Sequence, residues 1–166
     1  MPEKKTIERA REDAREGKSP STQAGDFVRE EIHHIREGKH GARSTQQAIA
    51  IGLSKARRAG VKLKVPKKGT ASEETRRAAA RDARKGRSGG KKKTSARRSR
   101  AMLKRLKREG RSAASPQALA RQARSAARRR SAASRSASAK KAARTKGPAK
   151  RRAAAKKGAR TRARRR

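Results

Sequence analysis

The residues best suited to chemistry lie in one short stretch, where two Glu-x-x-His pairs overlap. Glu30 and His33 form the first pair, and Glu31 and His34 form the second. Carboxylate and imidazole groups at this helical spacing occur in carboxylate-bridged metal sites, which draw their ligands from several facing helices. Here one predicted helix offers all four groups. We therefore expect a solvated polar face, with a metal site or a pH-sensitive contact in a dimer as the alternative.

No set of residues predicts catalysis. His40 falls in a predicted loop, where we expect a phosphate contact or an ordinary loop residue. No Ser stands in a Gly-x-Ser-x-Gly elbow, and the paired carboxylates Glu30/Glu31 and Glu73/Glu74 lie on predicted helices too small to desolvate them. The chain has no Cys, which excludes a thiol nucleophile and a Cys-based zinc finger. We expect a protein that is not an enzyme and that uses no cofactor.

The basic residues point to a polyanion as the partner. The chain has 54 Lys and Arg against 13 Asp and Glu, a net charge of +41, and residues 110–166 carry 21 of these cations without one acid. So much charge repels itself unless phosphates neutralise it. The chain has no Tyr or Trp, which argues against base stacking, and phosphate contacts carry no sequence information. We expect binding to duplex DNA without sequence preference, with RNA as the alternative.

The cations predicted to contact phosphate belong to three segments: a core helix, a Gly-rich linker and the C-terminal tail. They are Lys55, Arg57 and Arg58 on the helix, Lys91, Lys92 and Lys93 in the linker, and Arg128, Arg129, Arg130, Lys140, Lys141, Arg144, Lys150, Arg151, Arg152, Lys156, Lys157, Arg160, Arg162, Arg164, Arg165 and Arg166 in the tail.

The predicted core lies between residues 26 and 66, which contain the only Phe and most of the Ile and Val residues. Val28, Ile32 and Ile35 recur at helical spacing, which predicts a short amphipathic helix with Asp26 as its N-cap and Gly38 at its end.

A second core helix is predicted between Ser44 and Gly60. Ser44 and Gln47 form a capping box, and Gly52 lies among small and large apolar residues on one face, where a partner helix can approach closely. After Gly60, the segment Val61–Val65 alternates like an extended strand. The expected unit is a helical hairpin with an extended flap, either marginally stable alone or paired as a homodimer.

The remaining segments predict a mostly α chain in four parts. These are a charged N-terminal helix or arm (1–20), the hairpin core (21–69), a basic helical linker region (70–109) and a largely disordered tail (110–166). A short motif, in which basic residues flank a Gly, recurs four times in the sequence. It predicts helix ends at Gly17, Gly38, Gly86 and Gly110, with each Gly in the left-handed conformation. In the tail, repulsion between cations keeps the free chain open, and neutralisation by phosphate would permit a helix, which Gly147-Pro148 would interrupt.

Two resemblances bear on function. The run REGKHGARSTQQAIAIGLSKARRAGVKLKVPKKG, and QAIAIGLSKAR in particular, resembles a small basic bacterial domain of unknown function that is often followed by a Lys/Arg/Ala-rich tail. The composition from Ser125 onward resembles the tails of linker histones and bacterial histone-H1-like proteins. The first resemblance implies a bacterial source and the second a role on DNA.

The leading hypothesis is a histone-H1-like, nucleoid-associated protein of the bacterial cytoplasm that compacts DNA. An RNA- or ribosome-associated basic protein is one alternative, and a protein-interaction adaptor tethered to the nucleoid by its tail is another. No apolar run is long enough to span a membrane, so we expect no membrane contact, and nothing in the sequence suggests a small-molecule substrate.

Overall fold

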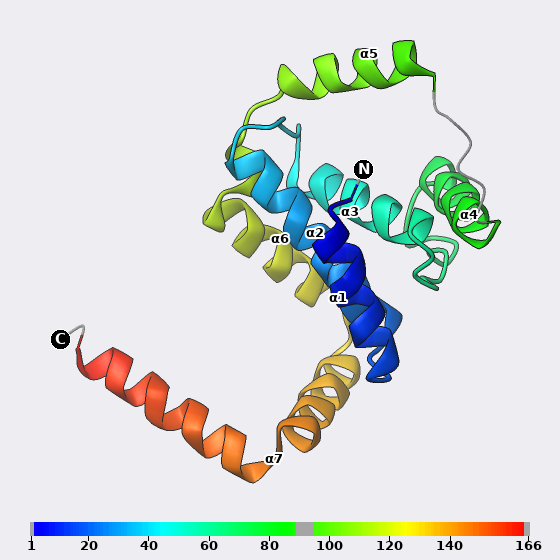
Figure 1. Ribbon diagram of the computed structural model, residues 1–166. Helices are drawn as coiled ribbons and strands as arrows, with labels where there is room; N and C mark the ends of the chain where they lie inside the picture. Colours follow the sequence, from blue (N-terminus) through cyan, green and yellow to red (C-terminus); the bar gives the residue numbers. More distant parts are fainter. Residues whose placement is uncertain (1, 89–94, 165–166) are drawn as a thin grey trace. The chain divides into compact units, whose positions relative to one another are not determined.

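The computed structural model describes residues 2–88 and 95–164, and the described residues are mostly helical, without a β-strand. The predicted mostly α class is confirmed. The chain divides into two compact units, Met1–Gln122 and Ala123–Arg166. The elements are α1 (Lys4–Arg15), α2 (Pro20–Arg36), α3 (Thr45–Arg58), α4 (Glu73–Arg87), α5 (Ala96–Lys107), the 3-10 turn η1 (Ser112–Ala114), α6 (Pro116–Arg128) and α7 (Ala132–Ala163) (Figure 1).

Helices α2 and α3 form the predicted hairpin, but α2 begins earlier than its apolar spacing indicates. Ser19 is the N-cap, its hydroxyl accepts a hydrogen bond from the Thr22 amide, and Pro20 takes the first helical position. This Ser-Pro pair is a strong start signal because Pro lacks the amide hydrogen that the first turn leaves unpaired. The prediction of Asp26 as N-cap is therefore wrong. Asp26 lies inside the helix, 3.2 Å from Arg29 Nη1.

The start and end of α3 confirm the sequence signals. Ser44 Oγ accepts a hydrogen bond from the Gln47 amide at 3.1 Å, as a capping box predicts. The Gln47 side chain returns one residue further than expected, since its Oε1 accepts from the Arg43 amide at 2.8 Å. At the other end, Gly60 has a φ of 95°. Only a residue without Cβ takes this left-handed conformation readily.

One apolar cluster joins the hairpin to a segment far away in the sequence. Ile32 and Ile35 of α2 and Ala48 of α3 pack with Ala113 and Ala114 of η1. Two hydrogen bonds fix this contact: Thr45 Oγ1 donates to the Ala113 carbonyl at 2.7 Å, and Arg36 Nε donates to the Ala114 carbonyl at 2.9 Å. The predicted tail boundary at residue 110 therefore falls inside the first unit, whose core extends beyond residues 26–66.

A second apolar cluster surrounds Phe27, which is fully buried. Ala10 of α1, Ala24 of α2 and Ala56 of α3 complete its buried part, and Ile7, Leu53, Val61 and Leu63 pack against it. Val61–Val65 thus covers Phe27 without forming the predicted strand. The Leu63 amide donates to the Val61 carbonyl at 2.8 Å, a tight turn, and no neighbouring strand among the described residues offers this segment a ladder.

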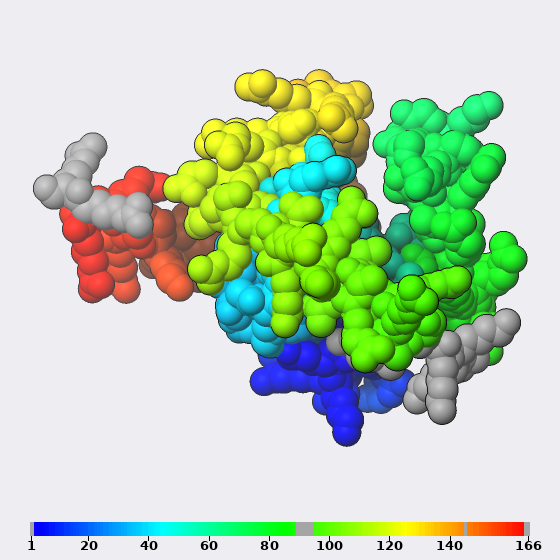
Figure 2. All heavy atoms as spheres, turned by 90° about the horizontal axis from the view of Figure 1, so that it is seen from above, coloured from blue at the N-terminus to red at the C-terminus, as the bar shows by residue number. Residues whose placement is uncertain are grey.

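The loop between α2 and α3 lies beneath the segment that follows α5. The Gly41 amide donates to the Leu106 carbonyl at 2.9 Å, and the Ala42 amide donates to the Gly110 carbonyl at 3.1 Å. Figure 2 shows the two segments side by side, the loop in cyan and the residues after α5 in light green. A Cβ on Gly41 would stand 1.9 Å from the Glu109 carbonyl oxygen, so a glycine is required there.

The four predicted helix-ending glycines divide into two pairs. Gly17 and Gly38 have φ values of 70° and 78° and follow the ends of α1 and α2, as predicted. Gly86 lies inside α4, where the absence of a side chain lets α4 approach α3 closely. A Cβ at this position would stand 1.9 Å from the Arg57 carbonyl oxygen of α3. Gly110 follows the end of α5 without a positive φ. The left-handed prediction is therefore wrong for this second pair.

The second unit contains the C-terminal end of α6 and the whole of α7. Residues 110–166 are predicted to be largely disordered, whereas in the structure Pro116–Arg128 and Ala132–Ala163 are helical. Abundant Ala, the residue with the highest helix propensity, accounts for the local preference. Gly147, with a φ of 67°, kinks α7 just before Pro148, which confirms the predicted break.

Candidate functional site

The three α3 cations that were predicted to contact phosphate all lie against partners within the chain. Lys55 Nζ is 2.5 Å from Glu31 Oε2 and 3.5 Å from Glu30 Oε1, and only 21% of its side chain is exposed. These two carboxylates of α2 hold the ammonium group between the helices of the hairpin. Lys55 therefore serves an internal ion pair in this structure and does not present its charge to a ligand.

Arg57 and Arg58 are engaged at the contact between α3 and α4. Arg57 is 8% exposed, and its Nη2 donates to the Lys64 carbonyl at 3.4 Å. Desolvation by burial lowers the pKa of Arg57, an effect that the charge of Asp82 partly opposes. Arg58 Nε donates to Asp82 Oδ1 at 2.7 Å, and Ser54 Oγ donates to the other Asp82 oxygen at 2.6 Å. Both arginines thus have partners within the chain, although 54% of the Arg58 side chain remains exposed, and a phosphate contact by these α3 cations stays a prediction.

The predicted tail cations lie mainly on exposed helical surface. Residues 110–166 contain no Asp or Glu, so no side-chain carboxylate of this segment can neutralise them. The predicted sites Lys91, Lys92, Lys93, Arg165 and Arg166 lie outside the described residues. The remaining predicted sites on α6, on α7 and at their ends are Arg128, Arg129, Arg130, Lys140, Lys141, Arg144, Lys150, Arg151, Arg152, Lys156, Lys157, Arg160, Arg162 and Arg164.

Arg130, a predicted site, and Arg135, which was not predicted as one, support the start of α7. Arg130 Nη2 donates to the Ser134 carbonyl at 2.9 Å, and Arg135 Nη1 donates to the Arg130 carbonyl at 2.8 Å. Ser131 caps the helix, since its Oγ accepts from the Ser134 amide at 3.2 Å. The cations further along α7 are exposed on several sides of the helix. This distribution suits a ligand that surrounds the helix or a groove that the helix enters.

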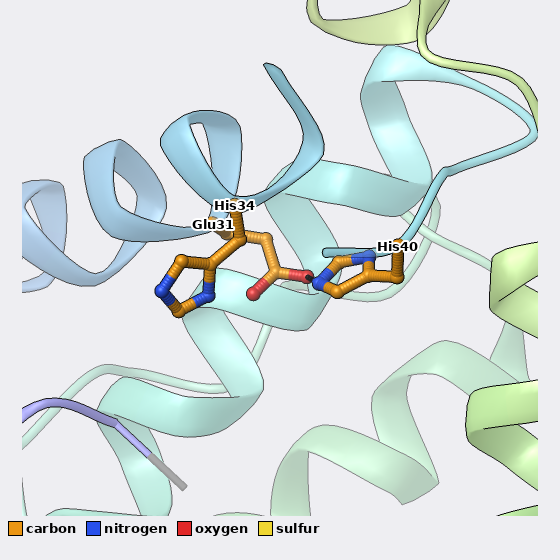
Figure 3. Close-up of side chains that lie close together, drawn as sticks. All are labelled: Glu31, His34 and His40. Carbon is orange, nitrogen blue, oxygen red and sulfur yellow. Dashed lines mark ion pairs between the residues drawn. The ribbon is translucent and has the colours of Figure 1, made fainter. Parts of the chain in front are cut away.

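A second group of polar residues, all buried or partly buried, lies between α2, α3 and the 37–44 loop (Figure 3). We call Glu30, Glu31, His34, His40 and Lys55 the Glu31 cluster. Glu31 is fully buried at its centre. His40 Nε2 lies 3.2 Å from Glu31 Oε1, while Lys55 approaches the other oxygen. The two histidine rings flank this carboxylate, and their centroids are 6.3 Å apart.

The N-terminal residues close one side of the Glu31 cluster. His34 Nε2 lies 3.0 Å from Glu3 Oε1, and the Glu3 amide donates to Glu30 Oε2 at 3.1 Å. The hydrogen bond with His34 lowers the pKa of Glu3. On the inner side of its ring, His34 Nδ1 stands 4.0 Å from Glu30 Oε1. Glu31, His34 and His40 together place one ligand atom each within 4.8 Å of one another.

The expectation of a solvated polar face is wrong for the two carboxylates, since Glu30 is 7% exposed and Glu31 is fully buried. His33 is exposed, as predicted. His40 lies in the loop, as predicted, and its Nε2 is 3.2 Å from Glu31 Oε1, with 10% of its side chain exposed. The pattern of α2 alone does not show the burial of these carboxylates, because the neighbouring groups come from elsewhere. Lys55 of α3 brings a positive charge to Glu31, and His40 of the loop lies beside the same carboxylate.

Residues 15–69 match the model of a family described as a family of unknown function, DUF6496. This match confirms the predicted domain of unknown function and covers α2, α3 and the segment up to Gly69. No curated protein matches the chain, and no solved structure does. Among the described residues, no helix combines the length and the hydrophobicity needed to cross a lipid bilayer.

Proposed function

We propose that this chain is a nucleic-acid-binding protein that neutralises and compacts duplex DNA without sequence preference, as a histone-H1-like component of the bacterial nucleoid in the cytoplasm. The observation that carries the proposal is the run of 21 cations and no acid in residues 110–166. Solubility alone does not require charge of one sign at this density, whereas a polyphosphate ligand offsets it directly.

The number of cations matches what DNA offers. Residues 123–166 contain 19 Lys and Arg residues. Duplex DNA carries one phosphate per about 1.7 Å along its axis, so the phosphates needed to neutralise about ten of these cations lie along roughly 17 Å of the duplex. Each neutralised phosphate releases counterions, and this entropy gain drives binding. The second unit therefore has enough charge to bind DNA by this mechanism alone.

The arrangement of the first unit favours binding without sequence readout. A helix that reads bases inserts fixed Arg, Lys, Asn or Gln side chains into the major groove. On α3, Lys55, Arg57 and Arg58 are instead occupied by Glu31, the Lys64 carbonyl and Asp82. The cations that remain exposed on α7 stand on an Ala-rich helix, where they suit phosphate contacts, which position a protein without specifying a sequence.

The tail is proposed to be largely disordered in the free protein and helical, as in α7, when phosphates neutralise it. Helix α7 has twelve cations and no anion, so like-charge pairs at i, i+4 oppose it in water. Phosphates would remove that cost and leave the high helix propensity of Ala. Folding of the tail and compaction of DNA would then be one event.

The test compares the full chain with a chain that ends at Gln122. This end point preserves Ala113, Ala114 and Leu119, which belong to the first core cluster. The truncated chain keeps 35 of 54 cations and all 13 acids, a net charge of 35 − 13 = +22, so it should still bind DNA, more weakly. Fluorescence anisotropy with labelled duplexes across 50–200 mM salt gives the slope of log K against log salt.

If about ten tail cations contact phosphates, the tail contributes about −9 to this slope, and its removal should flatten the slope by that amount. Duplexes of unrelated sequence should bind alike in both chains. Equal slopes for the two chains would overturn the assignment of the tail as the binding element. Tighter retention by a structured RNA of equal length and charge, at the same salt, would favour the RNA-associated alternative.

A further inference from the structure

The two histidines of the Glu31 cluster each have one ring nitrogen committed as a donor. His34 Nε2 lies 3.0 Å from the carboxylate of Glu3, and His40 Nδ1 lies 3.1 Å from the Gly41 carbonyl. Both of these partners only accept hydrogen bonds, so each of the two nitrogens carries a hydrogen. In a neutral imidazole the other nitrogen is then a bare lone pair. For His34 this is Nδ1, and for His40 it is Nε2.

Both lone pairs point toward carboxylates, which are themselves acceptors. His40 Nε2 lies 3.2 Å from Glu31 Oε1, and His34 Nδ1 lies 4.0 Å from Glu30 Oε1. Neither of these carboxylate oxygens accepts a hydrogen bond from any residue that the structure describes. Acceptors that face one another in a buried site repel unless a positive charge lies between them. With both rings neutral, the cluster therefore has the donor atoms for a cation and no hydrogen atom between them.

The charge balance of the site points the same way. Glu3, Glu30 and Glu31 contribute three negative charges around the histidines, and Lys55 contributes one positive charge from inside the hairpin. A second ammonium, that of Lys39, stands at the rim 3.7 Å from Glu3, and it is shared with Glu37. Glu3 is half exposed and lies at the rim with Lys39, so the interior holds the carboxylates of Glu30 and Glu31 against the single ammonium of Lys55. A cation at the histidines would offset the negative charge that remains.

We propose that Glu31, His34 and His40 bind a Zn²⁺ ion. Two imidazole nitrogens and one carboxylate are a ligand set that Zn²⁺ accepts, and the fourth position is left to water or to the neighbouring Glu30. Bond lengths of about 2.0–2.1 Å around a tetrahedral ion place its ligand atoms roughly 3.3 Å apart. The separation of His40 Nε2 from Glu31 Oε1 is 3.2 Å, and all three ligand atoms lie within 4.8 Å. Small side-chain rotations would close the site around the ion.

The outer contacts of the two histidines are those that metal ligands have. A ligating imidazole donates its second N–H to a carboxylate or a backbone carbonyl, which fixes the tautomer and the ring orientation. Glu3 does this for His34, and the Gly41 carbonyl does it for His40. The ion would tie α2 to the 37–44 loop in a protein whose apolar clusters consist largely of Ala, and metal binding of this kind contributes directly to folding.

The test is zinc binding by the full-length protein in phosphate-free buffer, measured by competition with a chromogenic chelator. The chain supplies a matched control, because His33 is exposed on the same helix and outside the cluster. His34→Gln and His40→Gln should each weaken zinc binding at least about tenfold, whereas His33→Gln should leave it within about twofold. Glu3→Ala, which removes only an outer contact, should weaken it by about 10- to 100-fold.

Two further measurements keep the proposal falsifiable if a variant fails to fold. Co²⁺ added to the unaltered chain should give the intense visible absorption of a four-coordinate ion at one equivalent, and Zn²⁺ should displace it. Nitrogen NMR of the three histidines should show the Nδ1 of His34 and the Nε2 of His40 shifting when zinc is added, with His33 unchanged. Absence of one-to-one uptake, equal losses in the His33 and His34 variants, or two imidazolium rings that zinc does not alter would overturn the site.

Discussion

Gly52 of α3 lies directly against Val28 of α2, and a Cβ added at Gly52 would stand 2.7 Å from Val28 Cα. The obstacle is backbone, so the two helices would have to separate. We expect Gly52→Ala to lower the free energy of unfolding by about 1–3 kcal/mol, because overpacking outweighs the gain in helix propensity. Gly25, inside α2 with nothing within 4 Å of an added Cβ, is the control. There the same substitution should stabilise by about 0.5–1 kcal/mol. Urea denaturation measures the change in unfolding free energy for both variants. Changes of the same sign would contradict the close approach of the two helices at Gly52.

Asp82 links α4 to α3, and its replacement should loosen that contact. Its two oxygens accept hydrogen bonds from Ser54 Oγ and Arg58 Nε. Asp82→Ala should cost about 1.5–3 kcal/mol of unfolding free energy, the range for hydrogen bonds to a charged group. Glu8→Ala changes the net charge equally at an exposed position of α1 and should have little effect. Comparable losses for the two variants would indicate that net charge, rather than the contact, sets the stability.

Replacement of Arg58 and of Arg151 by Gln should affect different properties, the melting temperature for Arg58 and the salt slope of DNA binding for Arg151. Arg58 is bound to Asp82, whereas Arg151 is exposed on α7. Arg151→Gln should reduce the salt slope of DNA binding by about 1 and leave the melting temperature unchanged. Arg58→Gln should lower the melting temperature and leave the slope almost unchanged. Anisotropy titrations and thermal melts of both variants test this, and a fall in slope for Arg58→Gln alone would make α3 the DNA-contacting element.

Helix α7 should depend on the ligand. In the free protein, we expect amides of residues 132–163 to exchange at near-unfolded rates, while Ile35, Ala48 and Gly52 of the first unit exchange slowly. Duplex DNA should slow exchange in the tail and raise the helical circular dichroism signal, and a neutral polymer of similar size should do neither. Full protection of the tail without DNA would show that its helix is stable alone, which would contradict the proposed coupling of folding and binding.

Local features of the fold were predictable because their physical causes are local. The Ser44–Gln47 cap, the left-handed Gly60 and the small residue at Gly52 each follow from one residue type at one position. The start of α2 at Ser19 has the same kind of signal, a Ser followed by Pro20, but the apolar spacing begins only at Phe27 and indicates a later start.

Features that depend on distant partners were not predictable. Ala113 and Ala114 enter the core although small residues in a basic segment carry no periodic signal. The burial of Glu31 requires Lys55 and His40, which come from a different helix and a loop. A single sequence likewise does not show that the Lys64 carbonyl accepts a hydrogen bond from Arg57 and that Asp82 accepts one from Arg58.

The closure of the first core cluster by Ala113 and Ala114 has a consequence for synthesis on the ribosome. Helices α2 and α3 can pair once Arg58 has left the exit tunnel, yet Ile35 and Ala48 lack their cover until η1 follows, 114 − 58 = 56 residues later. At about 5–20 residues per second, this leaves the nascent hairpin with an open apolar surface for roughly 3–11 s. The segment that matches the family model, residues 15–69, has emerged well before that interval ends, so this segment is shorter than the unit that can finish folding.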